Sequence, residues 1–514
     1  MKRILIRSGM RPTNVYTPED IYLKDRTGFN NGNLAYQYSI YRALWNDDVE
    51  IHADGLSSNP NLAEKINENY DLYVMPLADA FRDDFRPVLR NYTQLIRKLK
   101  IPVIVTGVGL RANYEPQLDE GFSFDEDVTN FVKAVLEKSA QIGVRGQITA
   151  DYLKKLGFNA ELDFRVIGCP SLYTFGREIK LRDFHLTDQS TIAINASPTS
   201  SEIAINFLNN MITTYKDYHF IPQHLDEFHL MYAGGPDISS DINGYPTNIQ
   251  HKYYQEGRVK YFTSMPSWFD FVKKVDFSIG SRLHGNVIPT IVGTPNISFV
   301  QDARMRELAS YHALPHVTID ELEKTNNLQE LLTKVDLKSA EKVQARNFDN
   351  YIDFLDTNGL NHIYKYDKNR KSAPMDELIN SITFPTSPDP ISILNPQEML
   401  NRVKISTNLL KERHDFSTRY RVNLVNNQLT QLKKTTSEQN KKYQQKITET
   451  QEKNQQLEKQ LTDTKQKLQL TINKNHELTN KIRHYQGTLN RKSVKTTLKV
   501  ANSLANLKKK VSRS

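Results

Sequence analysis

The sequence of 514 residues contains one cysteine, Cys169, and no apolar run long enough to cross a membrane. A single cysteine excludes an intrachain disulfide framework and a metal site built from several thiolates. The longest strongly apolar stretch, 101–110, is interrupted by threonine and glycine, whereas a spanning helix needs about 18 apolar residues or more. The first seven residues place charges around a very short apolar run, so they lack a signal-peptide core. We therefore expect a cytoplasmic protein with no metal site.

Proline and glycine almost disappear from the C-terminal part of the chain. None of the 21 prolines follows Pro396, and of the 21 glycines only Gly487 does. Because both residues interrupt helices, their scarcity predicts long helices there. We predict a helical, coiled-coil segment over 398–490 and a basic tail over 491–514.

A heptad repeat can be laid along this segment from Tyr443 to Leu489. Nine of its fourteen a and d positions are apolar or aromatic, and Asn454 and Asn475 occupy two of the others. Asparagine at such a position lowers stability but can fix the register of the helices. The pattern favours a homo-oligomer, a dimer or trimer, held by a coiled coil. The alternative is a polar, partly frayed helix.

Positive charge is concentrated in the same region. Residues 401–514 contain 26 Lys and Arg against 8 Asp and Glu, whereas the first 400 residues contain 42 against 51. A basic tail attracts anionic membranes, nucleic acids or acidic partners over about 8 Å at physiological salt. We expect peripheral contact with an anionic membrane, at the inner face of the plasma membrane, and no nucleic-acid partner. A solvated, lysine-rich helix explains the composition equally well.

The first 365 residues alternate short β-rich runs with helical patterns, which is typical of parallel sheets with crossover helices. A polar stretch, 174–190, separates two such series. The sequence thus predicts an α/β protein with two Rossmann-like, doubly wound domains, 1–180 and 189–365, facing a cleft in a GT-B-like arrangement. A proline-containing linker, 366–397, would lead to the helical tail. The expected strands are Arg3–Ile6, Glu50–His52, Leu72–Met75, Val103–Thr106, Gln141–Val144, Phe164–Ile167, Thr191–Asn195, His219–Ile221, Val259–Thr263, Asp276–Ile279 and Ile297–Phe299.

The segment 275–286 reads as a strand, a turn of small residues and the start of a helix. Its two glycines allow close approach of a ligand, and a helix N-terminus attracts anions. Arg282 can bind a phosphate or carboxylate through two parallel hydrogen bonds, and His284 can exchange protons near neutral pH. In the alternative, Arg282 pairs with a structural carboxylate and His284 is an ordinary turn residue. The candidate site residues of this segment are Ser281, Arg282, Leu283, His284 and Gly285.

Five further polar residues are predicted to bind substrate, because they open a helix or follow a strand. Asparagine also caps helices well, a lone histidine is more often structural, and an arginine after a strand can simply fix the turn. These residues are Asn31, Asn33, Arg145, Gln223 and His224. Cys169 is interpreted as a small buried apolar residue.

Four segments, in order, resemble the polysaccharide pyruvyl transferase family. They are an Asn/Gly-rich loop at 28–34, a glycine-containing strand end at 104–109, the segment 142–157 around Arg145, and G-S-R-L-H-G at 280–285. The resemblance covers residues 1–320 and leaves out the chain from about 400. Two positions depart from the family pattern: Cys169 stands where an acidic residue is frequent, and the segment of Arg304 often contains lysine.

The resemblance implies transfer of a pyruvyl group from phosphoenolpyruvate to two sugar hydroxyls, which forms a cyclic ketal and releases phosphate. The acceptor would be a cell-surface glycan or its lipid-linked oligosaccharide precursor, and no cofactor would be required. On this interpretation Arg282 and the N–H groups at 283–285 bind the phosphate, and Arg145 holds the carboxylate from the other domain. His284 contacts the phosphate and acts in acid catalysis.

The sequence does not identify the general base. Asp79, Asp226 and Glu227 follow apolar strands, although each is better explained as a solvated or helix-capping carboxylate. Two other functions stay open. One is a GT-B-type glycosyltransferase that uses a nucleotide sugar, and the other is a non-catalytic scaffold in a polysaccharide assembly complex.

Overall fold

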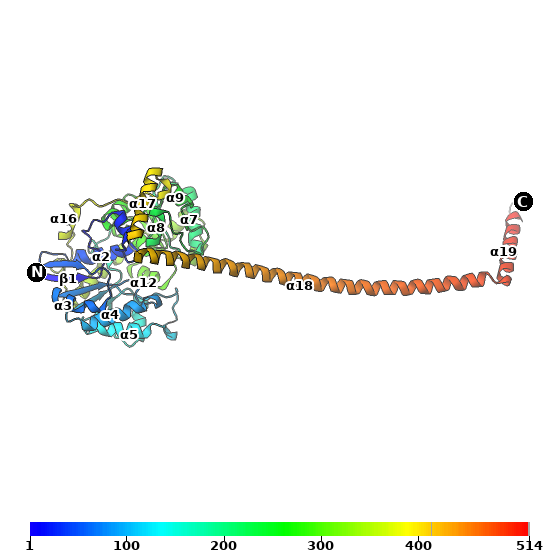
Figure 1. The fold of residues 1–514 in the computed structure, drawn as a ribbon, viewed down its shortest axis with the longest axis horizontal. Coiled ribbons are helices and arrows are strands. Elements are labelled where there is room, and N and C mark those ends of the chain that lie inside the picture. The colour runs from blue at the N-terminus through cyan, green and yellow to red at the C-terminus, as the bar shows by residue number, and fades with distance from the viewer. Residues whose placement is uncertain (413, 512–514) are drawn as a thin grey trace. The chain divides into compact units, whose positions relative to one another are not determined.

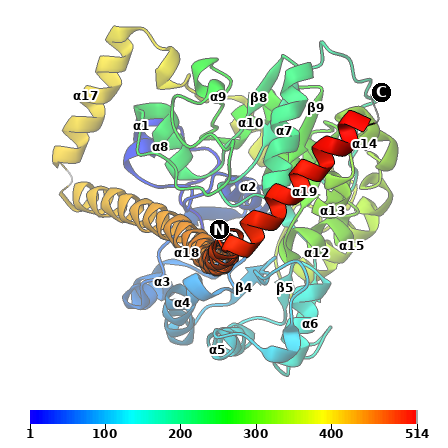
Figure 2. The same cartoon turned by 90° about the vertical axis from the view of Figure 1, so that its right-hand side faces the viewer.

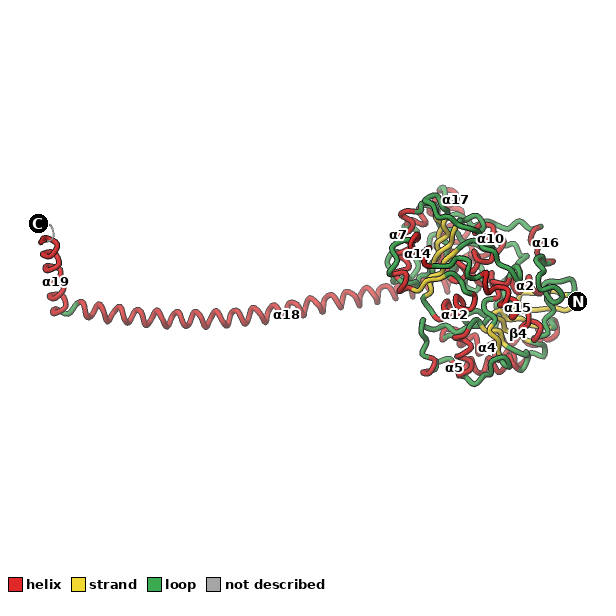
Figure 3. Tube along the Cα trace, turned by 180° about the vertical axis from the view of Figure 1, so that it is seen from behind, coloured by secondary structure: helices red, strands yellow, loops and turns green. Residues whose placement is uncertain are grey.

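The computed structural model describes residues 1–412 and 414–511 (Figure 1). The chain divides into two compact units, a body of residues 1–421 and a tail of residues 422–514. The body is an α/β structure in which the strands lie inside and helices surround them (Figure 3). The expected α/β class is therefore correct.

The first half of the body contains a parallel sheet in the order β2-β1-β3-β4. Strands β5 and β6 pair with each other, and a bridge from Val144 to Val108 attaches them to the chain that leaves β4. β3 and β4 are apolar and buried along their whole length, as parallel strands covered on both faces are. The strands are β1 (Lys2–Ile6), β2 (Val49–Ala53), β3 (Leu72–Pro76), β4 (Val103–Thr106), β5 (Ile142–Val144) and β6 (Phe164–Val166). The helices are α1 (Pro18–Leu23), α2 (Gly32–Leu44), α3 (Ala63–Asn69), α4 (Arg86–Lys98), α5 (Asp125–Leu136) and α6 (Gln147–Lys155).

The second half contains a parallel sheet of five strands in the order β11-β10-β9-β7-β8. The expected strand Val259–Thr263 is wrong, because only Val259 makes a bridge, to Phe220. The edge strand β11 was not expected from the sequence. The strands are β7 (Ile192–Asn195), β8 (Tyr218–Phe220), β9 (Phe277–Gly280), β10 (Asn296–Val300) and β11 (His316–Thr318). The helices are α7 (Glu202–Thr214), α8 (Leu225–Ala233), α9 (Lys252–Gln255), α10 (Met265–Val272), α11 (Leu283–Ile291), α12 (Ala303–His312), α13 (Ile319–Glu323) and α14 (Leu328–Lys334).

The chain then crosses back onto the first half through α15 (Glu341–Thr357) and α16 (Pro374–Asn380). The side chain of Asn350 on α15 donates to the carbonyl of Val166 at 2.7 Å. On α16, Asp376 forms an ion pair at 2.7 Å with Arg42 of α2. Two corrections follow. Residues 341–365 were expected to belong to the second domain, but α15 also packs against the first half. Residues 366–397 were expected to be a linker, but Pro374 opens a helix within them that packs on the body.

The remaining chain is helical, as its shortage of proline and glycine predicts. It forms α17 (Pro396–Glu412), α18 (His414–Leu489) and α19 (Lys492–Val511) (Figures 1 and 2). Pairing of α18 into a coiled coil stays a prediction. Among the described residues, no helix combines the length and the apolar character that crossing a membrane requires.

Candidate active site

Each sheet has one point where the order of its strands reverses, between β1 and β3 in the first half and between β7 and β9 in the second. At such a switch point the connections leave in opposite directions and open a crevice at the carboxyl ends of the strands. Residues that follow these four strands, namely Arg7, Asp79, Ser197 and Arg282, line a single cavity of about 260 Å³. The cavity therefore lies where the switch points of both sheets meet.

Positive charge dominates this cavity, because five arginines and two aspartates line it. Arg304 bridges the two carboxylates, with nitrogens 3.2 Å from Asp79 and 3.3 Å from Asp302. Burial alone would raise the pKa of Asp79, but the nearby arginines hold it well below its ordinary value. Asp79 is therefore ionised and a poor base at neutral pH. The arginines are Arg7, Arg82, Arg111, Arg282 and Arg304.

Arg282 is held by three protein groups. Its Nε donates to the carbonyl of Ala196 at 3.0 Å, one Nη donates to His224 Nε2 at 2.8 Å, and the other donates to Glu227 at 3.0 Å. A guanidinium has five N–H groups, so two remain after these contacts. The pairing with a structural carboxylate is therefore present, and Arg282 also lines the cavity, so its binding of a ligand stays a prediction.

Glu227 is a buried structural carboxylate and not a free base. It accepts the backbone N–H groups of Gln223 and His224 at 3.1 and 2.7 Å, at the start of α8, and also the hydroxyl of Tyr245. Burial and the charge of Arg282 lower the pKa of His224 to about 4. Because Arg282 donates to its Nε2, the neutral ring of His224 carries its proton on Nδ1.

His284 lies in the contact between the two halves, and neither His284 nor Arg145 lines the cavity. A Cβ placed on Gly32 would lie 2.7 Å from His284 Nδ1, and His284 Nε2 lies 4.0 Å from the sulfur of Cys169. Burial, together with Arg145 and Arg304, lowers the pKa of His284 to about 3. Arg145 donates from Nε to the carbonyl of Gly107 at 2.9 Å, whereas one of its buried Nη atoms has no hydrogen-bond partner.

Other candidate residues, such as Gly285 and Asn31, have structural roles. A Cβ on Gly280 would lie 1.8 Å from the carbonyl oxygen of Asn195, and one on Gly285 would lie 2.5 Å from its Cγ. The glycines of this segment therefore make room for Asn195, where the sequence suggested room for a ligand. Asn31 donates its backbone N–H to the carbonyl of Gln223 at 2.9 Å, which fastens the two halves together. The candidates on the cavity wall are Asn33, His224, Ser281 and Arg282, and those away from it are Asn31, Arg145, Gln223, Leu283, His284 and Gly285.

Sequence reasoning missed most of the cavity's arginines. Arg7 follows β1 directly, Arg82 and Arg111 lie in the loops after β3 and β4, and Arg304 comes shortly after β10. A search for arginines just beyond expected strand ends would have found them. In the described ranges, no three His, Cys, Asp or Glu side chains are placed to hold a metal ion.

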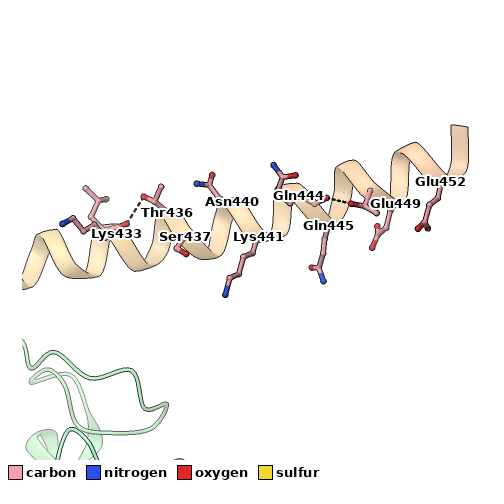
Figure 4. A pocket seen from close by; sticks show the side chains of 11 residues that line it. Lys433, Thr436, Ser437, Asn440, Lys441, Gln444, Gln445, Glu449 and Glu452 are labelled. Atoms are coloured by element: carbon pink, nitrogen blue, oxygen red, sulfur yellow. Dashed lines mark hydrogen bonds between the residues drawn. The ribbon is translucent and has the colours of Figure 1, made fainter. Parts of the chain in front are cut away.

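A larger hollow of about 1040 Å³ runs along α18 between Leu432 and Glu452. Only residues of that one helix line it, and polar side chains such as Asn440 and Gln444 project from its surface (Figure 4). A surface formed by one helix cannot enclose a ligand, so the cavity between the sheets is the better candidate site.

Comparison with known proteins gives one matching family and several solved structures of low similarity. The family model described as "Polysaccharide pyruvyl transferase" matches residues 18–302. A search of curated proteins finds no match. Among solved structures, the chain is similar to Anabaena HepE in complex with UDP and glucose, with 13% identity, coverage of 68% of this chain and 97% of that chain, and a TM-score of 0.35.

Two further solved structures show comparable similarity. The S. aureus MnaA–UDP structure has 13% identity, coverage of 73% and 99% of the two chains, and a TM-score of 0.37. Methanocaldococcus jannaschii UDP-GlcNAc 2-epimerase, in complex with UDP-GlcNAc and UDP, has 12% identity, coverage of 67% and 98%, and a TM-score of 0.37.

Proposed function

Because the chain belongs to the polysaccharide pyruvyl transferase family, we propose that it transfers a pyruvyl group from phosphoenolpyruvate to two hydroxyls of a sugar. The acceptor is a cell-surface glycan or its precursor, and the products are a cyclic ketal and phosphate. The arginine-lined cavity at the two switch points carries this proposal. The donor brings a phosphate and a carboxylate, and converging guanidinium groups are suited to bind both.

We assign the phosphate to the arginines that the cavity exposes most directly. Arg111 is exposed at the cavity. Arg304 pairs with Asp79 and Asp302, which fix its position at the cavity wall. Arg282 contributes its two remaining N–H groups. Arg145 does not line the cavity, but one of its buried Nη atoms has no hydrogen-bond partner. The donor carboxylate supplies that partner in our proposal, as the donor enters between the two halves, because a buried charged nitrogen without a partner is costly.

The proton chemistry requires a group that first accepts and then releases a proton. The two acceptor oxygens form bonds to C2 of the donor, the C2–O bond to phosphate breaks, one hydroxyl proton goes to C3 and the other leaves with phosphate. His224 and His284 are both neutral at pH 7 because burial and arginines lower their pKa values. Of the two, only His224 lines the cavity. A bound anionic donor offsets the charge of Arg282 and raises the pKa of that ring, which lets it carry the proton.

The test is an assay of phosphate release from phosphoenolpyruvate, with a panel of β-galactoside and N-acetylhexosamine acceptors and mass spectrometry of the product. We expect Arg304→Ala to lower kcat/KM by about 100-fold or more, since it removes a charge from the phosphate site. Arg97→Ala is the matched control, because Arg97 is exposed at the end of α4. Equal activity of the two variants would overturn the donor site.

The same assay separates the competing functions. Release of a nucleotide from a sugar nucleotide, with no phosphate from phosphoenolpyruvate, would identify a glycosyltransferase. A stable, folded chain that turns over neither donor would support the scaffold.

We also propose that α18 joins copies of the chain in a coiled coil. Its heptad leucines are exposed on a single helix, including Leu461 and Leu468 at d positions, and a long isolated helix with such a stripe gains stability by burying it in a partner. Replacing both with asparagine should reduce the mass in solution toward 59.3 kDa. Leu470→Asn is the control, since Leu470 is at least as exposed but lies outside the a and d positions. An unchanged mass in the double variant would end this proposal.

A further inference from the structure

Helix α19, Lys492–Val511, has two contrasting faces. At 100° per residue, the aliphatic residues fall on one half of the helix, and the exposed members include Leu498 and Leu504, which are 46% and 61% exposed. Lys492, Lys495 and Lys499 fall on the other half. The helix thus presents an apolar face bordered by lysines. Between 492 and 509, the aliphatic residues of this half are Val494, Leu498, Val500, Ala501, Leu504, Ala505 and Leu507.

The charge of α19 differs from that of the helix before it. The range 492–511 contains six lysines and no aspartate or glutamate, whereas α18 intersperses acidic residues among its basic ones. A turn at 490–491 separates the two helices. Lys508 falls on the apolar half at the C-terminal end, where its long side chain can reach the polar boundary. The polar face is therefore complementary to a surface of uniform negative charge.

We propose that α19 lies in the surface of an anionic lipid bilayer, with its aliphatic face in the acyl boundary and its lysines at the headgroups. A basic amphipathic helix of low overall hydrophobicity binds in this way without spanning the membrane. A groove on a protein fits less well, since protein pockets favour aromatic anchors and α19 contains none. The proposal concerns the tail alone and does not rest on the catalytic activity of the body.

The test is sedimentation of the full-length chain with vesicles of phosphatidylcholine containing 30% phosphatidylserine, and with vesicles of phosphatidylcholine alone. We expect the chain to bind the anionic vesicles about tenfold more tightly than the neutral ones. Its affinity for the anionic vesicles should fall about tenfold between 0.05 and 0.5 M NaCl. Leu498→Asn with Leu504→Asn should abolish binding without changing charge. Lys495→Gln with Lys499→Gln should weaken it several-fold while preserving helix propensity.

Leu470→Asn on α18 is the matched control and should bind like the unaltered chain. Phosphate release in the absence of vesicles should be the same for every one of these variants. Three results would each overturn the proposal: no binding to anionic vesicles, as expected of a helix that docks on an acidic protein; equal, salt-insensitive binding to both vesicles; or full binding by the Leu498/Leu504 variant.

Discussion

Replacing Glu227 with glutamine tests the ion pair that holds Arg282. The carboxylate accepts from two backbone N–H groups, from Arg282 and from the hydroxyl of Tyr245, and its side chain is 1% exposed. Glutamine keeps the shape but replaces one accepting oxygen with an NH₂ group that faces donors. Removing one partner of a buried pair costs about 3–5 kcal/mol, and we expect a loss of that size in the free energy of unfolding.

Urea unfolding followed by circular dichroism at pH 7 measures this loss. The control is Glu178→Gln, because Glu178 pairs with Lys371 on the surface, where both side chains are more than two-thirds exposed, and such pairs contribute little. A loss below about 1 kcal/mol for Glu227→Gln would show that Arg282 does not depend on this carboxylate. Phosphate release should fall as well, since Arg282 and His224 both lose a fixed neighbour.

Three further predictions concern stability. Gly280→Ala should cost about 3 kcal/mol or more in urea unfolding, because its Cβ would collide with the carbonyl of Asn195; a loss under about 1 kcal/mol would contradict the packing. Burial lowers the pKa of His312 to about 3, so below pH 6.5 the unfolded chain binds a proton that the folded chain does not, and the free energy of unfolding falls as the pH falls. His312→Gln should reduce the loss of stability between pH 7 and 4.5 by about 3 kcal/mol. An unchanged pH profile would refute this. Burial raises the pKa of Glu307 to about 7, and this shift has the opposite effect on stability. The contribution of Glu307 to the free energy of unfolding is complete below about pH 4.5 and is lost as the pH rises to 7. Glu307→Gln should flatten that part of the profile by about 3 kcal/mol, and the same slope in both proteins would exclude the effect.

The strands were predictable where burial leaves a continuous apolar run. Leu72–Met75 and Val103–Thr106 are buried along their whole length, and the structure places strands there. The edge strand β11 was missed because it is short and begins with the exposed His316. The strand predicted at Val259–Thr263 was wrong for the opposite reason. Its apolar side chains pack in the core, but the backbone forms only one bridge, from Val259 to Phe220.

The site was predictable only in part. The segment 280–285 indicated an arginine at the mouth of the second sheet, and Arg282 does line the cavity. The carboxylate that holds it, Glu227, is 55 residues away along the chain, and no local pattern connects the two. His284 has the chemistry expected of a proton carrier but does not line the cavity, because the helix that begins at Leu283 turns its side chain toward Gly32.

What the sequence by itself determined is local: the alternation of strands and helices, the helical tail, its charge and the glycine-bearing turn after β9. These follow from periodicity and backbone preference over a few residues. Only the tertiary structure decided which charges meet. Arg7, Arg111 and Arg304 come from separate segments after strands of the two sheets, and the folding of both sheets brings them to one cavity. Electrostatic interaction depends on distance in space and not along the chain, so the charge of the site exists only once both sheets have formed.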